Sequence, residues 1–313
     1  MTDKIQPLKV PATMDGVKLD RFLFRHFPGL PRAAFHKACR SGELRVDSKR
    51  MKGTERIAAG ALVRVPPLFK EFEKTEIKGP KPQDGSAFSL SDLEFLRKTI
   101  IYNDDDMVAF NKPAGLAAQG GTGIAKSLDK MAAALFPGKT VLPVHRLDKE
   151  TSGVIIFAKN LAAARDLSAQ LQDKSAAKEY LAVLAGDIKK KKGVIETMIA
   201  KKDGGDDLKN AITEYEVLGS IPGKMSLVRF NPKTGRTHQL RIHSAKELRA
   251  AIFGDGIYGH KGDAAKYGFG RISHLHLLAK KLSVRHPATG EPIELSVPVP
   301  EFMQCAVKGI MGH

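Results

Sequence analysis

The nine residues from His145 to Gly153, His-Arg-Leu-Asp-Lys-Glu-Thr-Ser-Gly, place one carboxylate in a short polar loop. The loop lies between an apolar stretch and the strand-like run Val154–Ala158. Asp148 has basic residues beside it, Arg146 and Lys149, so its carboxylate can stay ionised and meet an anionic substrate. The ordinary role of a lone loop aspartate is to accept backbone hydrogen bonds in a turn. Asp148 is therefore a catalytic candidate that needs support from other segments.

A tyrosine in a later strand is a second candidate. Residues Lys178 to Gly186 alternate with a period of two, which predicts a strand with Tyr180 on one face. An isolated tyrosine in such a strand is most often a half-buried core residue. The alternation alone therefore gives Tyr180 no chemical role.

The segment Asn231–His243 supplies basic side chains: Asn-Pro-Lys-Thr-Gly-Arg-Thr-His-Gln-Leu-Arg-Ile-His. After the Thr-Gly turn, Thr237 is suited to cap a helix that covers His238 to about Leu248. A helix N-terminus beside Arg236 would attract a phosphate. Arg241, one turn further along, can instead point toward the core.

Two other enzyme classes can be weighed against this chemistry. Residues Gly120–Ser127 approach the phosphate-loop pattern of an ATPase or GTPase, but Ala125 replaces the second required glycine. A hydrolase triad of Ser152, His145 and Asp148 is disfavoured, because the serine lacks the Gly-x-Ser-x-Gly elbow. Three residues within eight positions would also align poorly.

A metal site is not expected. His238 and His243 are five positions apart, so on a helix they would diverge by more than a right angle. His274 and His276 have no carboxylate or cysteine at a suitable spacing. Core or RNA-contacting histidines are the favoured interpretation.

The charge balance favours a polyanionic partner. The 313 residues include 51 Lys and Arg against 34 Asp and Glu, for a formal net charge of +17, which favours nucleic acid ahead of an anionic membrane. The longest apolar runs have the length of strands, and the polar start lacks the apolar region of a signal peptide. Because Cys39 and Cys305 lie far apart, we expect neither a disulfide framework nor a zinc ribbon, and a reducing cytoplasm as the compartment.

Composition divides the chain into three parts. Residues 1–68 show a helix-turn-helix pattern followed by short strands. Residues 1–70 hold more than half of the net positive charge. Arg32, Lys37 and Arg40 share one face of the second helix there, although a charged face is usually just solvated. Residues 69–92 have the Lys, Glu, Pro and Gly content of a flexible linker. Residues 93–313 alternate strands and helices, which predicts an α+β domain with a mixed sheet and helices on its flanks.

Four motifs in order resemble the RluA family of RNA pseudouridine synthases: Asn-Lys-Pro-Ala-Gly at Asn111–Gly115, the segment around Asp148, the strand around Tyr180, and Thr-Gly-Arg-Thr-His-Gln-Leu-Arg-Ile-His at Thr234–His243. Ahead of them, the segments Leu19–Leu23, Pro31–Arg32 and Ser41–Asp47 resemble the S4 RNA-binding module. The branch that modifies 23S ribosomal RNA, the RluC-like branch, is the most similar. The resemblance covers about Asp15 to Met303 and implies a small S4-like domain ahead of the catalytic domain.

The resemblance also implies roles for individual residues. Asp148 would be the catalytic group, acting by attack at C1′ of the sugar or by removal of the 2′ proton. Arg241 would form an ion pair with Asp148, and Tyr180 would pack against the flipped uracil and assist proton removal. Arg146 would fill the gap left by the flipped base, Arg236 and Thr237 would grip phosphate, and the basic face of Arg32, Lys37 and Arg40 would add affinity for RNA.

The expected enzyme is a cytoplasmic monomer that acts on 23S ribosomal RNA, without cofactor or metal and away from membranes. Two alternatives stay open: the same chemistry on transfer RNA or another RNA, and a non-catalytic RNA-binding protein of ribosome assembly.

Overall fold

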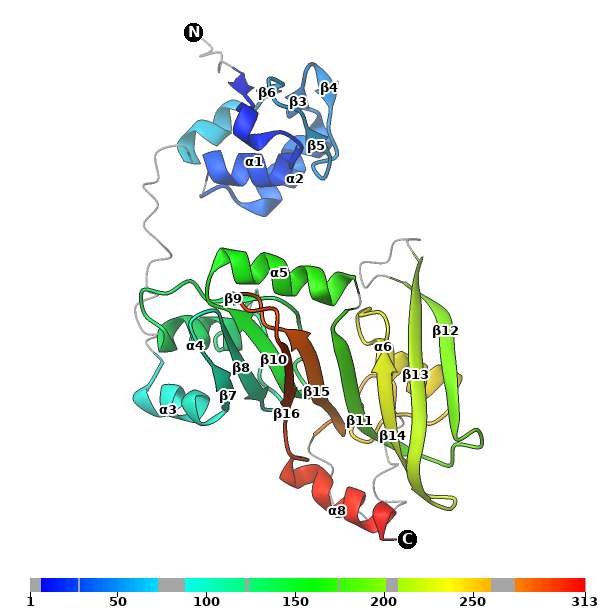
Figure 1. Cartoon of the computed structure of the whole chain (residues 1–313). Coiled ribbons are helices and arrows are strands. Elements are labelled where there is room, and N and C mark those ends of the chain that lie inside the picture. The colour runs from blue at the N-terminus through cyan, green and yellow to red at the C-terminus, as the bar shows by residue number, and fades with distance from the viewer. Residues whose placement is uncertain are drawn as a thin grey trace. The chain divides into compact units, whose positions relative to one another are not determined.

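In a computed structural model the chain divides into two units, Met1–Ala87 and Phe88–His313, and each is described by itself (Figure 1). The structure describes residues 7–27, 29–72, 88–121, 124–173, 175–200, 208–259 and 274–312. Residues 73–87, most of the expected linker, lie outside these ranges, as do residues 122 and 123 of the Gly-rich segment. No helix within the described ranges is both long and apolar enough to span a membrane.

The first unit combines short helices with small antiparallel sheets. In chain order its elements are β1 (Leu8–Lys9), η1 (Ala12–Met14), β2 (Val17–Lys18), α1 (Leu19–His26), α2 (Arg32–Ser41), β3 (Arg45–Val46), β4 (Lys49–Arg50), β5 (Arg56–Ile57), β6 (Leu62–Arg64) and η2 (Pro67–Phe72). Strands β1, β6, β3 and β4 form one sheet in that order, and β2 pairs with β5. Leu19, Phe22 and Leu23 of α1 recur at helical spacing and are buried in its core.

The linker expected at residues 69–92 is shorter at both ends in the structure. At its start, Phe69 is only 1% exposed and packs in the core of the first unit. At its end, Ser89 caps helix α3 (Leu90–Lys98) in a reciprocal capping box with Asp92. Composition did not reveal either boundary, because each depends on a single residue, the buried Phe69 or the capping Ser89.

The second unit is built on one long mixed sheet. Its remaining elements are β7 (Ile100–Asn103), β8 (Met107–Lys112), α4 (Leu128–Leu135), β9 (Leu142–Pro143), β10 (Ser152–Ala158), α5 (Leu161–Gln172), β11 (Ala177–Ala185), β12 (Lys192–Ala200), β13 (Leu208–Ile221), β14 (Met225–Pro232), α6 (Gln239–Ile242), η3 (His243–Glu247), β15 (Leu277–Arg285), β16 (Pro292–Ser296) and α8 (Glu301–Met311). The strand order is β12-β13-β14-β11-β15-β10-β8-β7, with β16 beside β15 and β9 beside β10 (Figure 1). Among these pairs only β10 with β15 is parallel.

Helices cover both faces of this sheet, because its central strands are apolar on both sides. In β10, Val154 and Ile156 pack in a cluster with residues of α5 and α8, whereas Ile155 and Phe157 pack in a cluster with residues of α4. In the adjoining part of the sheet, Ala182 of β11 packs in a cluster with residues of α6. The predicted α+β class, a mixed sheet with flanking helices, is confirmed.

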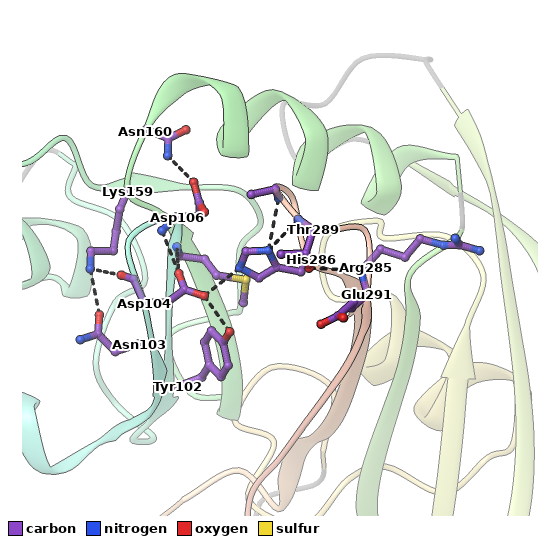
Figure 2. A network of polar contacts seen from close by, with 12 residues as sticks. Tyr102, Asn103, Asp104, Asp106, Lys159, Asn160, Arg285, His286, Thr289 and Glu291 are labelled. Carbon is purple, nitrogen blue, oxygen red and sulfur yellow. Dashed lines mark hydrogen bonds and ion pairs between the residues drawn. The ribbon is translucent and has the colours of Figure 1, made fainter.

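A polar network connects the β7–β8 strand pair to the β15–β16 hairpin (Figure 2). Asp104, between β7 and β8, accepts hydrogen bonds from Tyr102 Oη (2.6 Å), from His286 Nε2 (2.8 Å) and from the backbone N–H groups of Asp106 and Met107. Burial alone would raise the pKa of Asp104, but these hydrogen bonds lower it to about 2. The carboxylate therefore holds the β7–β8 turn against the β15–β16 hairpin at neutral pH.

One glycine sets the approach of β10 to β15 directly after the polar loop that carries Asp148. Gly153 has φ of +113°, and a Cβ built there would lie 2.2 Å from the carbonyl oxygen of Ala279. Gly153 pairs with Ala279 in the parallel ladder. Only glycine fits this position, so the Thr-Ser-Gly end of the motif is explained by packing.

We expect Gly153→Ala to lower the free energy of unfolding by about 3 kcal/mol, because the new methyl group must push two strands apart and occupy a strained φ. Urea unfolding followed by circular dichroism measures this change. Gly256→Ala is the matched control: nothing lies within 4 Å of its Cβ and its φ is unrestricted, so its stability should stay within about 0.5 kcal/mol of the parent. Equal stability of the two variants would contradict the β10–β15 register.

Candidate active site

The Asp148 loop is held in place by backbone contacts from a distant turn. Between β9 and β10, the N–H of Thr151 donates to the carbonyl of Asp148 (3.1 Å). The carbonyl of Lys149 accepts from the N–H of Gly115 (2.9 Å) and from Nζ of Lys112 (3.0 Å). The Asn-Lys-Pro-Ala-Gly turn is thus the support on which this loop rests.

Lys112 is the centre of that support. Its side chain is fully buried, and its Nζ also donates to the carbonyls of Pro113 (2.9 Å) and Leu116 (2.8 Å). Burial lowers the pKa of Lys112 to about 7, although Glu150 and Asp148 act in the opposite direction. A buried amine bonded to three carbonyls has no capacity left for a substrate, so its role is structural.

The side chain of Asp148 lies where two cavities meet, and it is about one-third exposed (32%). One is a narrow cavity of about 110 Å³, whose lining includes Arg146, Asp148, Tyr180, Arg236, His238 and Arg241. The other is a wider groove of about 700 Å³, whose lining includes Arg146, Asp148, Lys149, Thr237, His238 and Arg241. The structure therefore brings together the six site residues predicted in the second unit. Arg146, Asp148 and Arg241 line both spaces, Tyr180 and Arg236 line the narrow cavity only, and Thr237 lines the groove only.

Tyr180 contributes a neutral phenol to the narrow cavity. Burial raises the pKa of Tyr180 well above its ordinary value, and the negative charge of Asp148 raises it further. The hydroxyl therefore stays protonated at neutral pH. A neutral phenol can pack and donate a hydrogen bond, but it is a poor base. Of the two roles expected for Tyr180, packing is therefore favoured over proton removal.

The resemblance implied an ion pair between Arg241 and Asp148, but Arg241 has a different partner in the structure. It makes a bidentate pair with Asp255, with Nε 2.8 Å from Oδ2 and Nη2 2.6 Å from Oδ1. The Asp255 carboxylate is completely buried and also accepts the N–H groups of Ile257 and Tyr258 (2.9 Å each). Since a buried carboxylate needs a counter-charge more than a partly exposed one, Arg241 goes to Asp255.

Within the described part of the chain, the side chain paired with the Asp148 carboxylate is His238, whose Nε2 lies 3.9 Å from Oδ2. Nδ1 of His238 is 3.1 Å from the hydroxyl of Tyr258, and the two rings meet edge to face. No catalytic role was expected for His238 or for the segment Gly254–Gly259. The signal was present in an aspartate and a tyrosine set among three closely spaced glycines.

The predicted helix cap at Thr237 is wrong. His238, in a left-handed conformation with φ of 55°, precedes helix α6, which is only four residues long and continues as the π-helical η3. The buried side chain of Gln239 imposes this turn: its Oε1 accepts from the N–H of Arg236 (3.0 Å), and its Nε2 donates to the carbonyl of Ile212 (3.0 Å). Arg236 itself donates from Nε to the carbonyl of Asn210 (2.9 Å).

The residues of the rejected hydrolase triad have other partners. Nε2 of His145 accepts the N–H of Ile156 (3.0 Å), and Ser152 Oγ donates to the carbonyl of Leu277 (3.4 Å). Burial lowers the pKa of His145 to about 3, with a smaller effect from Lys178. A neutral His145 is thus a backbone acceptor that fixes the start of the loop.

Of the histidines considered for a metal site, His274 and His276 both pack against the ring of Phe302. His243 is fully buried between Thr213 (3.0 Å) and Thr197 (3.2 Å), and burial lowers its pKa to about 4. A different group, Asp104 with Asp106 and His286, brings possible ligand atoms within 4.8 Å of one another. Both oxygens of Asp104 are already engaged in the network of Figure 2, so this cluster is explained by its own hydrogen bonds.

The remaining candidates lie in the first unit. Arg32, Lys37 and Arg40 are all exposed along α2, and the guanidinium of Arg32 lies 5.4 Å from the centre of the Phe24 ring. The opposite side of α2 carries the buried Phe35. The basic face predicted for this helix is therefore open to a ligand.

The chain is similar to a known protein family and to bacterial enzymes. A protein family described as RNA pseudouridylate synthase matches residues 106–246. The ribosomal large subunit pseudouridine synthase C of Vibrio vulnificus (strain CMCP6) is 32% identical over 316 residues, which covers 98% of this chain and 97% of the relative. The protein of the same description from Escherichia coli (strain K12) is 31% identical, with coverage of 97% and 96%.

Two solved human structures are similar as well. RNA pseudouridylate synthase domain containing 4 has a TM-score of 0.58 and 28% identity, and the match covers 67% of this chain and 92% of that one. RNA pseudouridylate synthase domain containing 1 has a TM-score of 0.52 and 28% identity, with coverage of 64% and 82%. The similarity to the bacterial relatives thus spans nearly the whole chain, and that to the human structures about two-thirds of it.

Asp255→Asn should destabilise the protein by about 3 kcal/mol at neutral pH, because it leaves Arg241 buried without a counter-charge. Burial alone would raise the pKa of Asp255, but the hydrogen bonds from Arg241 and from two N–H groups lower it. The folded state therefore binds fewer protons, so this stabilisation is complete above about pH 4 and is lost as the pH falls through the folded pKa. Urea unfolding at several pH values measures the difference.

The matched control is Asp105→Asn, since the Asp105 side chain is 97% exposed and bonds only to Lys139 among the described residues. Its stability should change by less than about 0.5 kcal/mol at any pH. The difference in free energy of unfolding between Asp255→Asn and wild type should become smaller at acid pH. If it does not, the charge of the carboxylate is not what stabilises the site.

Proposed function

The chain belongs to the RluA-type RNA pseudouridine synthases and isomerises uridine to pseudouridine within RNA; from this premise we propose that its substrate is a uridine of 23S ribosomal RNA and that Asp148 is the catalytic group. The names of the bacterial relatives, both ribosomal large subunit pseudouridine synthase C, support this choice of RNA. The observation that carries the role of Asp148 is its position at the meeting point of a narrow cavity and a wide groove. We infer that the narrow cavity takes a single base and that the wide groove takes the RNA strand.

The reaction rearranges bonds within one nucleotide. The N1–C1′ bond breaks, the uracil turns in its cavity, and C5 bonds to C1′. C5 then loses its proton to solvent and N1 takes one up, so the product is an isomer of the starting nucleotide. Asp148 acts at the sugar, either by attack on C1′ or by removing the 2′ proton, and both routes need an ionised carboxylate with a free lone pair. No redox change or group transfer from outside occurs, so the proposed reaction needs no cofactor or metal.

The target base must leave its stack to reach Asp148, which costs a few kcal/mol. Arg146 is exposed and lines both cavities, which supports a role in filling the gap in the RNA. Tyr180 would pack as a neutral phenol against the uracil. Arg236 and Thr237 would contact the phosphates beside the target nucleotide.

The first unit would act as an S4-like module that adds electrostatic affinity for RNA. The exposed face of Arg32, Lys37 and Arg40 on α2 supports this, because every phosphate neutralised by a cation releases counterions. We propose that the enzyme acts in the cytoplasm and as a monomer.

Asp148→Asn should abolish turnover and leave RNA affinity unchanged, because an amide of similar size cannot act at the sugar. The measurement is tritium release from 23S ribosomal RNA transcribed with tritium at uridine C5. Glu150→Gln, which removes a charge from the same loop, is the control and should keep most of the activity. Release by Asp148→Asn at the wild-type rate would overturn the role of Asp148, and release only from transfer RNA transcripts would overturn the proposed substrate.

Replacing Arg32, Lys37 and Arg40 together by Gln should weaken RNA binding and reduce the slope of log K against log salt concentration by about 2 to 3. Filter binding of a 23S fragment between low and physiological salt gives this slope. The charge-matched control replaces three exposed lysines of the second unit, Lys189, Lys190 and Lys191. The α2 face has no RNA-binding role if both triple variants change the slope equally.

A further inference from the structure

A line of side-chain contacts runs from the buried Arg241–Asp255 pair to the catalytic carboxylate. The hydroxyl of Tyr258 lies 3.1 Å from Nδ1 of His238, and Nε2 on the other side of the same ring lies 3.9 Å from Oδ2 of Asp148. His238 lines both cavities beside Asp148. The imidazole is thus the bridge between a tyrosine and the group that does the chemistry.

Tyr258 itself is anchored firmly. Its N–H donates to Oδ1 of Asp255 (2.9 Å), and the guanidinium carbon of Arg241 lies 5.3 Å from the centre of its ring. The turn closes at Gly259, whose N–H donates to the carbonyl of Asp255 (3.0 Å) and where a Cβ would lie 2.5 Å from that oxygen. The position of the Tyr258 hydroxyl is therefore set by the buried ion pair.

The protons on His238 can be assigned from its neighbours. If Nδ1 of the neutral ring carried the proton, the lone pair of Nε2 would face the negative oxygen of Asp148, which is repulsive. If the Tyr258 hydroxyl donates to Nδ1, the ring proton is on Nε2 and points at Asp148. Burial, together with Asp255 and Asp148, raises the pKa of Tyr258 against the opposing effect of Arg241, so its hydroxyl proton is present to donate.

We propose that Tyr258 and His238 are positioning residues for Asp148: the Tyr258 hydroxyl fixes the Nε2–H tautomer of His238, and that N–H orients one oxygen of the Asp148 carboxylate. The proposal rests on the proposed catalytic role of Asp148. At 3.9 Å the contact to Oδ2 is longer than a hydrogen bond. Catalytic hydrogen bonds are often long in the free enzyme and tighten with substrate, so Oδ2 becomes the held oxygen and Oδ1 faces the sugar.

The kinetic test is a double-mutant cycle. Tyr258→Phe keeps the ring under Arg241 but loses the hydroxyl, and it should lower kcat about tenfold with KM nearly unchanged, as expected for one lost hydrogen bond. His238→Ala should lower kcat about 100-fold, and His238→Gln should recover part of this loss because its amide N–H can take the place of Nε2–H. Tyr258→Phe should then have no further effect in the His238→Gln background.

Tyr102→Phe is the matched control. It also removes one tyrosine hydroxyl from a hydrogen bond to a polar partner, in the network of Figure 2 rather than at the site. It should lower stability without changing kcat. Losses in kcat that add fully for Tyr258→Phe and His238→Gln would overturn the proposal, because the hydroxyl would then act by a path other than the imidazole.

A second measurement needs no RNA, so it separates this proposal from the proposed function. The full chain is labelled with ¹⁵N-histidine, and two-bond ¹⁵N–¹H correlations at pH 8 report which ring nitrogen carries the proton. The His238 signals are those missing from His238→Gln. We expect the Nε2–H tautomer in the wild type and a mixture of tautomers in Tyr258→Phe; a proton on Nδ1 in the wild type would overturn the proposal whether or not 23S RNA is the substrate.

Discussion

The buried ion pair between Arg241 and Asp255 is the interaction on which the rest of the site depends. Two charges removed from water stabilise a fold only when geometry and further hydrogen bonds offset their desolvation. Here the guanidinium binds both carboxylate oxygens, and the backbone N–H groups of Ile257 and Tyr258 complete the set. The pair joins helix α6 to the Gly254–Gly259 turn, and Arg241 also lines the cavity that contains Asp148.

Asp148 is held from two directions by different means. From the sheet, rigid backbone contacts fix the loop: Gly153 lies against Ala279, and the buried amine of Lys112 bonds the carbonyl of Lys149. From the cavity, side chains of α6 and of the Gly254–Gly259 turn set the electrostatics. The position of the Asp148 backbone and the charges around its carboxylate are therefore set by different parts of the fold. In this way a loop residue can be placed as accurately as one in a strand.

Local patterns predicted strands β10 and β11, whereas the set of side chains around Asp148 was predicted from the family resemblance. The apolar run of β10 depends on neighbours within a few residues, and it appears where expected. The partner of Arg241 could not be predicted in this way, because two carboxylates lie within its reach and only burial decides between them. Asp255 is completely buried and Asp148 is 32% exposed, a difference that no sequence period encodes.

The difference in burial between Asp255 and Asp148 also suits the chemistry that we propose for Asp148. A carboxylate clamped by a bidentate arginine has both oxygens engaged and little freedom to attack C1′ or to take a proton. Because Asp255 takes the arginine, Asp148 keeps a nearby positive charge for electrostatic support while its lone pairs remain available. Nε2 of His238 lies 3.9 Å from Oδ2, and in our proposal it holds this oxygen and leaves Oδ1 free. An arrangement of this kind supports either route at the sugar, so the choice between them lies with the placement of the ribose and not with the carboxylate.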